Sequence, residues 1–420
     1  MKATHFALAA SALTLIGAFV GVRVKSQPAQ AVCDTATTPF CNSIVPVPSG
    51  WSGPVFRLSQ NYPANIAADS QPWRAFNPKT QPEAYIKTVL AYFYEGNLRP
   101  DIERSFDPAQ NTVRQWYSAP WQDLGANGRE PLHGLTRERV SRPGELAPSQ
   151  THMWNNYAVG FYNAPGGYTI GQMWANHAQP NAALAAAMPD GTVAAKLLFT
   201  TATEQEVPYL QGAPEWSAYV YADPNDPAPN ATSPRAVIKV RLLQIDVAVK
   251  DSNSGSPTGW VFGTFVYGGG PGGALGAGWN AVAPVGLMWG NDPGNFNGAP
   301  LAETWLNPAV HMPHVGYQGR LNGPVDNKTS SCLSCHSTAE TPMGDMTGSD
   351  PTRWFRDLPS GTPFDTGRQS LDYSLQLAVG LNNFETRQFL KQAPAGLQPS
   401  LFKQFLQQSK TPPRDGGQTH

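Results

Sequence analysis

The sequence predicts an α+β fold in which a mainly antiparallel β core follows a mixed, loop-rich N-terminal region and precedes a helical C-terminal segment. The chain has 420 residues, with 40 glycines, 40 prolines and only 14% charged residues. This composition favours short strands joined by structured turns over long amphipathic helices. Runs of alternating apolar residues concentrate between residues 190 and 300, and helical spacing returns near the C-terminus. A hydrophobic share of 40% is sufficient for a core.

The first 31 residues are predicted to be a signal peptide. A basic Lys2 precedes the apolar run 6–22, and "PAQA" places small residues at the positions that signal peptidase recognises. We expect cleavage after Ala31 and export to the periplasm or beyond. The alternative is an uncleaved anchor, because Arg23 and Lys25 follow the apolar run. No later run approaches this length, so the mature chain is expected to contain no membrane span.

Export affects the interpretation of the four cysteines. Cys33 and Cys41 are expected to form a small disulfide loop in an oxidising compartment, the alternative being two free thiols.

Lys and Arg number 29 and Asp and Glu number 30. This balance gives no electrostatic reason to expect a nucleic acid or an anionic membrane as partner.

The region 32–189 is predicted to be loop-rich, with one helix and short strands. Apolar residues at helical intervals predict the helix near 83–98. The segment 157–174, "YAVGFYNAPGGYTIGQMW", is expected to form a hairpin with Gly166 and Gly167 at its turn.

The region 190–300 is predicted to be the antiparallel β domain. Strands are expected at 195–202 and 218–222. In 236–251 the apolar alternation slips by one residue, which predicts a β-bulge near 242–243. The run 259–270 is apolar on both faces and should be a central strand, and 268–300 is expected to be a connection.

The region 301–410 is predicted to contain a loop-like segment with a Cys-x-x-Cys-His motif and then helices at 370–392 and 400–408, before a tail at 411–420. The motif consists of Cys332, Cys335 and His336. Two thiols at this spacing can add to the two vinyl groups of one haem, and the next residue then supplies an imidazole to the iron. The sequence therefore predicts one covalent haem c, with His336 as its metal ligand. A thioredoxin-like redox pair, a structural zinc site and an ordinary disulfide are the alternatives.

The second axial ligand is left open by the sequence. The candidates are Met343, Met346, Met312, His311, His314 and Met288, or none. A thioether ligand suits electron transfer, whereas an open position suits small-molecule chemistry.

An arginine-rich stretch at 128–142 contains Arg129, His133, Arg137, Arg139 and Arg142. It could bind haem propionates or an anionic substrate. The favoured interpretation is a solvated surface loop in which Glu130 and Glu138 neutralise the arginines.

Four segments resemble, in order, the haem-binding β domain of the cytochrome P460 family: "DGTVAAKLLF" at 190–199, "DVAVKDSN" at 246–253, "GWVFGTFVY" at 259–267 and "CLSCH" at 332–336. The resemblance covers about 150 residues. It implies an exported, mostly antiparallel protein with one c-type haem, and in some members a lysine cross-linked to the porphyrin and hydroxylamine oxidation. Lys196 and Lys250 stand in the matching segments, and either or neither could contact the haem.

Three functions follow as hypotheses. The chain could be an electron carrier with an unknown redox partner protein, or a haem c oxidoreductase that turns over a small molecule, as the resemblance implies. It could also be a haem-based ligand-binding or sensing module without turnover.

Overall fold

The computed structural model describes residues 45–122, 129–230, 232–268, 275–344 and 350–392. The predicted α+β class with a mainly antiparallel sheet is confirmed. The signal peptide at 1–31, Cys33, Cys41, the helix at 400–408 and the tail at 411–420 lie outside the described residues. Within these residues, no helix combines the length and the hydrophobicity that a membrane crossing requires.

The main sheet has eight strands in the order β1-β2-β3-β5-β6-β7-β8, with β4 paired to β5, and all its pairs are antiparallel. The strands are β1 (Thr136–Arg137), β2 (Asn156–Tyr162), β3 (Val193–Thr200), β4 (Glu215–Tyr221), β5 (Arg235–Lys250), β6 (Trp260–Tyr267), β7 (Val282–Met288) and β8 (Thr304–Leu306). A small second sheet pairs β9 (Glu340–Thr341) with β10 (Gln369–Ser370).

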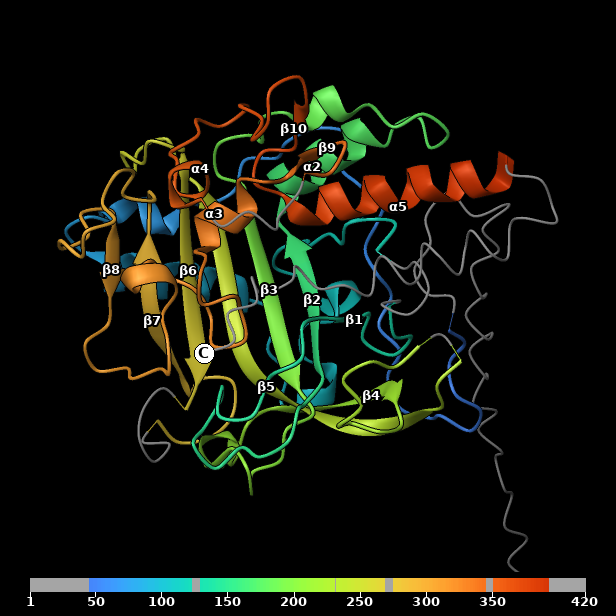
Figure 1. Cartoon of the computed structure of the whole chain (residues 1–420). Helices are drawn as coiled ribbons and strands as arrows, with labels where there is room; N and C mark the ends of the chain where they lie inside the picture. Colours follow the sequence, from blue (N-terminus) through green and yellow to red (C-terminus); the bar gives the residue numbers. More distant parts are fainter. Residues whose placement is uncertain (1–44, 123–128, 231, 269–274, 345–349, 393–420) are drawn as a thin grey trace, which may run out of the picture.

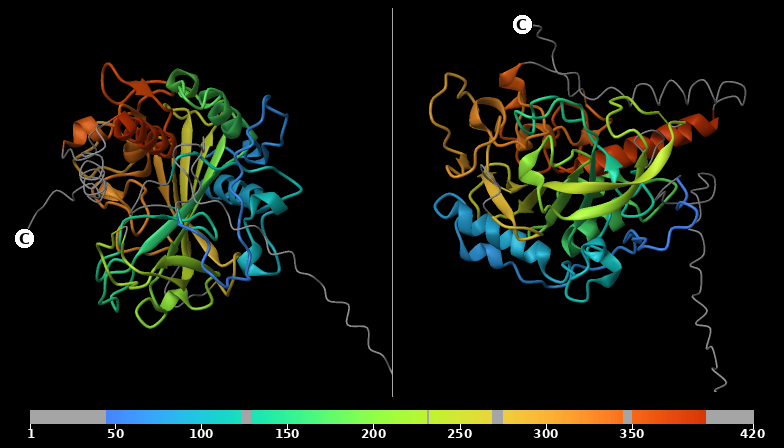
Figure 2. Two further views of the ribbon diagram at one scale, coloured as in Figure 1. Left: turned by 90° about the vertical axis from the view of Figure 1, so that its right-hand side faces the viewer. Right: turned by 90° about the horizontal axis from the view of Figure 1, so that it is seen from below.

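Helices cover both faces of the main sheet. They are α1 (Pro82–Tyr94), α2 (Ala164–Met173), α3 (Cys332–His336), α4 (Pro351–Trp354) and α5 (Leu375–Gln392). Short 3-10 helices lie at Pro72–Ala75, Ile102–Arg104, Pro108–Gln110, Ala182–Ala185, Pro208–Leu210 and Tyr317–Gly319. Helix α1 lies behind the sheet in Figure 1, whereas α3 and α5 lie in front of it, and the edge-on view in Figure 2 shows the three layers.

The predicted β-bulge in β5 is confirmed. Leu198 of β3 pairs with Gln244, and the next residue, Phe199, pairs with Leu242, so Leu243 is the extra residue. The bulge shifts the alternation of β5 by one residue, which keeps apolar side chains on the face beneath α1 along both halves of this long strand.

Strand β6 is central, as predicted, because it pairs with β5 and β7 and all of its residues are buried. The expected connection at 268–300 is wrong, since β7 lies within it. Pro284 obscured this strand in the sequence. The β6–β7 pairing shifts register beside Pro284, from Thr264–Gly286 to Phe265–Pro284. A bulge is where a strand tolerates a residue without an N–H group.

Helix α1 confirms the helix predicted near 83–98, although it ends at Tyr94. Pro82 starts it, and its inner face buries aromatic and aliphatic side chains. Gly263 of β6 allows a close approach, because a Cβ there would lie 1.7 Å from Cδ1 of Ile86.

The predicted hairpin at 157–174 is wrong beyond β2, because its second half is helix α2. Pro165 lies in the first turn of the helix, and Gly166 and Gly167 lie inside it. A Cβ at Gly167 would meet the ring of Tyr117 at 2.4 Å, and one at Gly166 would meet Tyr162 at 2.9 Å. The two glycines therefore permit close packing and do not form a turn.

The region 32–189 contributes β1 and β2 to the main sheet. Strand β2 pairs with β3 without interruption, from Asn156–Thr200 to Tyr162–Ala194. The hydrophobic cluster beneath α1 contains residues from Phe56 to Val325, so one core joins segments far apart in the sequence.

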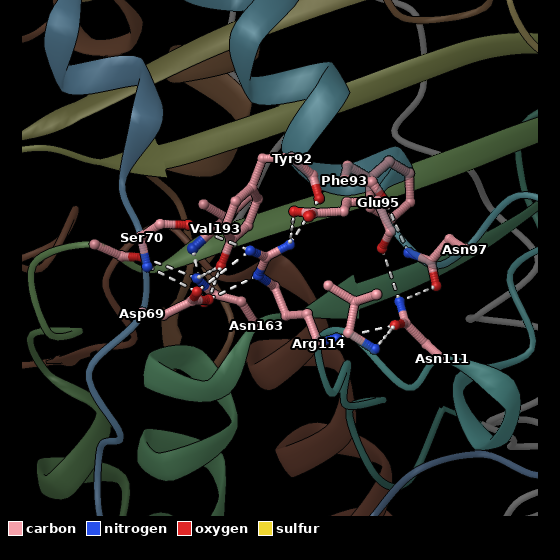
Figure 3. A network of polar contacts seen from close by, with 12 residues as sticks. Asp69, Ser70, Tyr92, Phe93, Glu95, Asn97, Asn111, Arg114, Asn163 and Val193 are labelled. Atoms are coloured by element: carbon pink, nitrogen blue, oxygen red, sulfur yellow. Dashed lines mark hydrogen bonds and ion pairs between the residues drawn. The ribbon is translucent and has the colours of Figure 1, made fainter.

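A polar network around the buried Arg114 side chain ties α1 to its surroundings (Figure 3). The Arg114 side chain is 7% exposed and lies between two carboxylates, with its Nε 2.7 Å from Asp69 and its Nη1 3.1 Å from Glu95. Its guanidinium also lies 3.6 Å from the ring centre of Tyr92. The Tyr92 hydroxyl donates to Asp69 at 2.6 Å, and Asn163 donates to that hydroxyl at 3.1 Å. These bonds link α1 to the segment before it and to the start of α2.

Candidate functional site

A row of polar side chains crosses the front face of the sheet below α3. The register aligns Lys196 of β3 with Asp246 of β5, and Asp246 with Thr264 of β6. Thr264 donates to Asp246 at 2.9 Å, and its Oγ1 lies 3.9 Å from the sulfur of Cys332. The pairing of three strands thus brings the predicted Cys-x-x-Cys-His motif next to a charged row.

The motif forms helix α3, so the predicted loop-like context is wrong. Ser331 caps the helix in a reciprocal capping box with Ser334. Ser331 also donates to the Asn291 side chain at 2.8 Å, and the Cys332 amide donates to the Leu321 carbonyl at 2.8 Å. The sequence contained this signal, because Ser331 and Ser334 stand at the capping-box spacing. The cap fixes the start of α3 against the segment that precedes it.

The two cysteines are half-buried free thiols. Burial, with the nearby carboxylates of Asp246 and Asp326, raises the pKa of the Cys332 thiol well above its usual value. Burial also raises the pKa of Cys335, to about 11. Both thiols are therefore protonated at neutral pH, unlike the low-pKa thiolate of a thioredoxin-like pair. A neutral thioether suits these acidic surroundings better than a thiolate does.

His336 is oriented by a backbone carbonyl. Its Nδ1 lies 2.7 Å from the Tyr373 oxygen. A carbonyl can only accept, so Nδ1 carries the proton and Nε2 retains its lone pair. Burial lowers the pKa of His336 to about 4, so the ring is neutral. The ring of Phe262 packs against the imidazole with 4.8 Å between ring centres. This is the state in which an imidazole binds a metal through Nε2.

Lys196 stands among carboxylates. Its ammonium lies 3.1 Å from Asp246. Burial opposes the charge, but Asp246, Asp326 and Glu138 outweigh it and raise the pKa of Lys196. Gln244 donates to both Asp246 and Asp326, at 2.7 Å and 3.3 Å. Lys196 therefore remains a cation at neutral pH.

Glu138 differs from the other acids of this group. Burial, together with the charges of Asp326 and Asp246, raises its pKa despite the opposing effect of Lys196. A carboxyl group with a raised pKa can serve in proton transfer. The group of Lys196, Glu138, Asp246, Gln244 and Asp326 is called the lysine cluster below.

Lys250, the other lysine of the predicted pair, lies elsewhere. Its ammonium is 3.5 Å from the fully buried carboxylate of Asp372 and 5.4 Å from the ring centre of Trp260. The side chain is 12% exposed, and burial lowers its pKa. Lys196, and not Lys250, belongs to the group beside Cys332.

The candidate second ligands are distributed unevenly. Met288 is fully buried, and half-buried Met312 and Met343 pack against the same apolar cluster as Cys332. His311 is exposed. His314 is half-buried, and burial lowers its pKa. Met346 lies outside the described residues.

The favoured interpretation of 128–142 as a solvated loop is wrong at its start. Arg129, Glu130 and His133 are at most 3% exposed. The Glu130 carboxylate accepts from backbone amides, including that of Leu132 at 2.9 Å, and so has a structural role. His133 stacks on Trp216 with 4.4 Å between ring centres.

Of the remaining arginines, Arg137 bonds to Asn155 at 2.8 Å. Arg139 extends toward the lysine cluster, since it donates to the carbonyls of Val325, at 2.6 Å, and Asp326, at 3.4 Å. Glu145 is its ion-pair partner, at 3.0 Å.

The donor set of the motif is one imidazole nitrogen beside two protonated thiols. Over the ranges that the structure describes, no three His, Cys, Asp or Glu side chains are grouped to hold a metal ion. His336 presents one free nitrogen, and the two thiols stand one turn of α3 apart beside it. The sequence did not identify Asp326 or Tyr373, and it indicated Glu138 only as an acid that neutralises the arginines of 128–142. Asp246 carried a signal, as an acid within a strand that is otherwise largely buried.

No family model matches the chain, and neither a curated protein nor a solved structure is similar enough to count as a match.

Proposed function

We propose that the chain is an exported c-type cytochrome that binds one haem through thioethers from Cys332 and Cys335, with Nε2 of His336 as axial ligand. The observation that carries this proposal is the hydrogen bond from Nδ1 of His336 to the Tyr373 carbonyl, at 2.7 Å, which leaves Nε2 as the metal-binding atom. The haem would supply one-electron chemistry at an iron centre. The predicted signal peptide would bring the chain to the compartment where cytochromes c are assembled.

We further propose haem-centred oxidoreduction of a small molecule, of the cytochrome P460 type, as the activity. The lysine cluster supports this over simple electron transfer. A carrier requires little more than an apolar cover for its haem, whereas this sheet face holds a cation, Lys196, and an acid with a raised pKa, Glu138. Lys196 would hold positive charge beside the cofactor, and Glu138 would exchange protons with the substrate. Lys196 is also the better candidate for the porphyrin-linked lysine, because it belongs to the group beside Cys332, whereas Lys250 lies beside Asp372.

The test is expression of the full chain in a host with a periplasmic haem-attachment system. The band on a denaturing gel should keep its haem colour, and the intact mass should rise by one haem. Cys332→Ala and Cys335→Ala should each reduce attachment. His336→Ala should retain the colour but change the absorption spectrum, because the thioethers hold the ring while the imidazole sets the state of the iron.

Two results would decide against the proposal. A colourless band of unmodified mass from a competent host would exclude covalent haem. A reduced, low-spin protein that is indifferent to carbon monoxide would favour an electron carrier over an enzyme with an open iron position.

A further inference from the structure

The turn before α5 has an unusual backbone. Asp372 and Tyr373 are consecutive, and both have a positive φ, 44° and 66°. Aspartate is enriched in this left-handed region, but a bulky residue such as tyrosine is rare there. Such a conformation persists only where the surrounding structure over-determines it.

The Asp372 carboxylate supplies that constraint. It is fully buried, and it accepts from the Met188 amide at 2.6 Å and from Nε1 of Trp260 at 3.1 Å. Lys250 lies 3.5 Å away as its counter-ion. The Asp372 amide donates to Ser370 at 3.1 Å. Three segments distant in sequence therefore fix one carboxylate.

Tyr373 is fixed in the same way. Its hydroxyl donates to the Leu358 carbonyl at 2.7 Å, and its ring lies 6.4 Å from that of Trp260 and 6.3 Å from that of Phe262. With both residues of the turn held, the Tyr373 carbonyl oxygen lies 2.7 Å from Nδ1 of His336.

From this we infer that Asp372 is the positioning residue of the axial histidine. Clamped by Trp260, Met188 and Lys250, it holds the left-handed turn whose carbonyl fixes the tautomer and orientation of the His336 imidazole. This inference rests on the proposed function, in which Nε2 of His336 binds haem iron. It gives Lys250 a role distinct from that of Lys196, because Lys250 is the counter-ion of the carboxylate that positions His336.

The first test uses the full chain without haem, labelled with ¹⁵N-histidine, and Asp372→Ala. Nitrogen couplings of His336, assigned with His336→Gln, report which ring nitrogen carries the proton. The wild type should show the Nδ1–H form. In Asp372→Ala the Nε2–H form, which an unconstrained imidazole favours, should become populated. Asp372→Gly should retain more Nδ1–H than Asp372→Ala, because glycine enters the left-handed region without a Cβ penalty.

The second test uses the haem-loaded protein. The hydrogen bond to Tyr373 makes His336 a more basic ligand, which favours ferric iron. The reduction potential should therefore rise in Asp372→Ala, and by less in Trp260→Phe, which removes one donor to Asp372 and keeps most of the ring packing. Asp350→Asn, the loss of an exposed carboxylate that caps α4, should change neither tautomer nor potential.

Folded Asp372→Ala and Trp260→Phe proteins with a wild-type tautomer and potential would overturn the inference. An Asp372→Gly protein that loses as much Nδ1–H as Asp372→Ala would show that the carboxylate clamp, and not the backbone preference of residue 372, holds the turn. Failure to incorporate haem would instead reject the proposed function. The tautomer measurement is made without haem, so its result does not depend on haem incorporation.

Discussion

The Lys196 ammonium is the cation of the lysine cluster and stands opposite Asp246 in the sheet. The side chains of Lys196 and Asp246 are 31% and 22% exposed, so solvent partly screens their ion pair. Glu138 and Asp326 surround the same cation. Loss of the cation would leave three acids beside the two cysteines without their counter-charge.

We predict that Lys196→Met lowers the reduction potential of the haem-loaded protein. Uncompensated carboxylates stabilise ferric over ferrous iron, and one charge in a partly buried site is worth about 1–2 kcal/mol. Spectroelectrochemical titration measures the shift. Lys239→Met is the matched control, because Lys239 is a lysine of the neighbouring strand β5 that is 49% exposed and pairs with Glu103. Equal potentials in wild type and Lys196→Met would separate Lys196 from the haem site.

At the scale of elements, α1 is secured by two kinds of contact. Its apolar face packs on the sheet where Gly263 leaves room for Ile86. Its polar side joins the network of Figure 3 through Tyr92 and Glu95. Burial opposes the charge of Asp69, but hydrogen bonds from Arg114 and Tyr92 lower its pKa below the ordinary 3.8.

This network makes the stability of the fold depend on pH. A depressed folded-state pKa means that charged Asp69 stabilises the fold at pH values above the unfolded-state pKa. That stabilisation is lost as the pH falls through the folded-state pKa. We predict that Asp69→Asn lowers the free energy of unfolding by about 1–2 kcal/mol at pH 7, and that the difference from wild type shrinks below about pH 4.

Denaturant titrations at a series of pH values measure this effect. Asp101→Asn is the control, because the Asp101 side chain is 57% exposed and its ion pair with Arg104 lies at the surface. A difference between Asp69→Asn and wild type that stays constant down to pH 2 would contradict the assigned role of the Asp69 charge.

For the molecule as a whole, the main sheet is the unit that joins the N-terminal region to the site. Strand β2 covers the edge of β3, which carries Lys196, and α1 covers the back of the sheet. The front face holds α3 and α5 (Figure 1), and the lysine cluster lies beside Cys332 of α3. The site therefore depends on segments from both halves of the chain.

We predict that a fragment beginning at residue 190 does not fold cooperatively. Without α1, β1 and β2, it would expose the edge of β3 and the apolar face that α1 covers. The full chain should unfold in one transition when followed by tryptophan fluorescence and by circular dichroism. A fragment with a native near-ultraviolet spectrum and a sharp transition would show instead that the N-terminal region is dispensable.

Local chemistry allowed several features to be predicted from the sequence alone. The bulge at Leu243 follows from a phase slip in β5, and the central position of β6 follows from its apolar residues on both faces. The motif of Cys332, Cys335 and His336 is contiguous, so its spacing is visible without a structure. Each of these signals lies within a few residues of chain.

Only the tertiary structure decided the features that depend on distant partners. Gly166 and Gly167 have the sequence of a turn, yet they pack inside α2 because Tyr162 and Tyr117 occupy the space beside them. The sequence does not distinguish Lys196 from Lys250 as the lysine of the site. The fold places Lys196 beside Asp246 and Lys250 beside Asp372. The tautomer of His336 depends on the Tyr373 carbonyl, 37 residues away. Local pattern determines which residues can form a strand or a ligand motif, whereas packing across the chain determines the charges and hydrogen bonds that each of them meets.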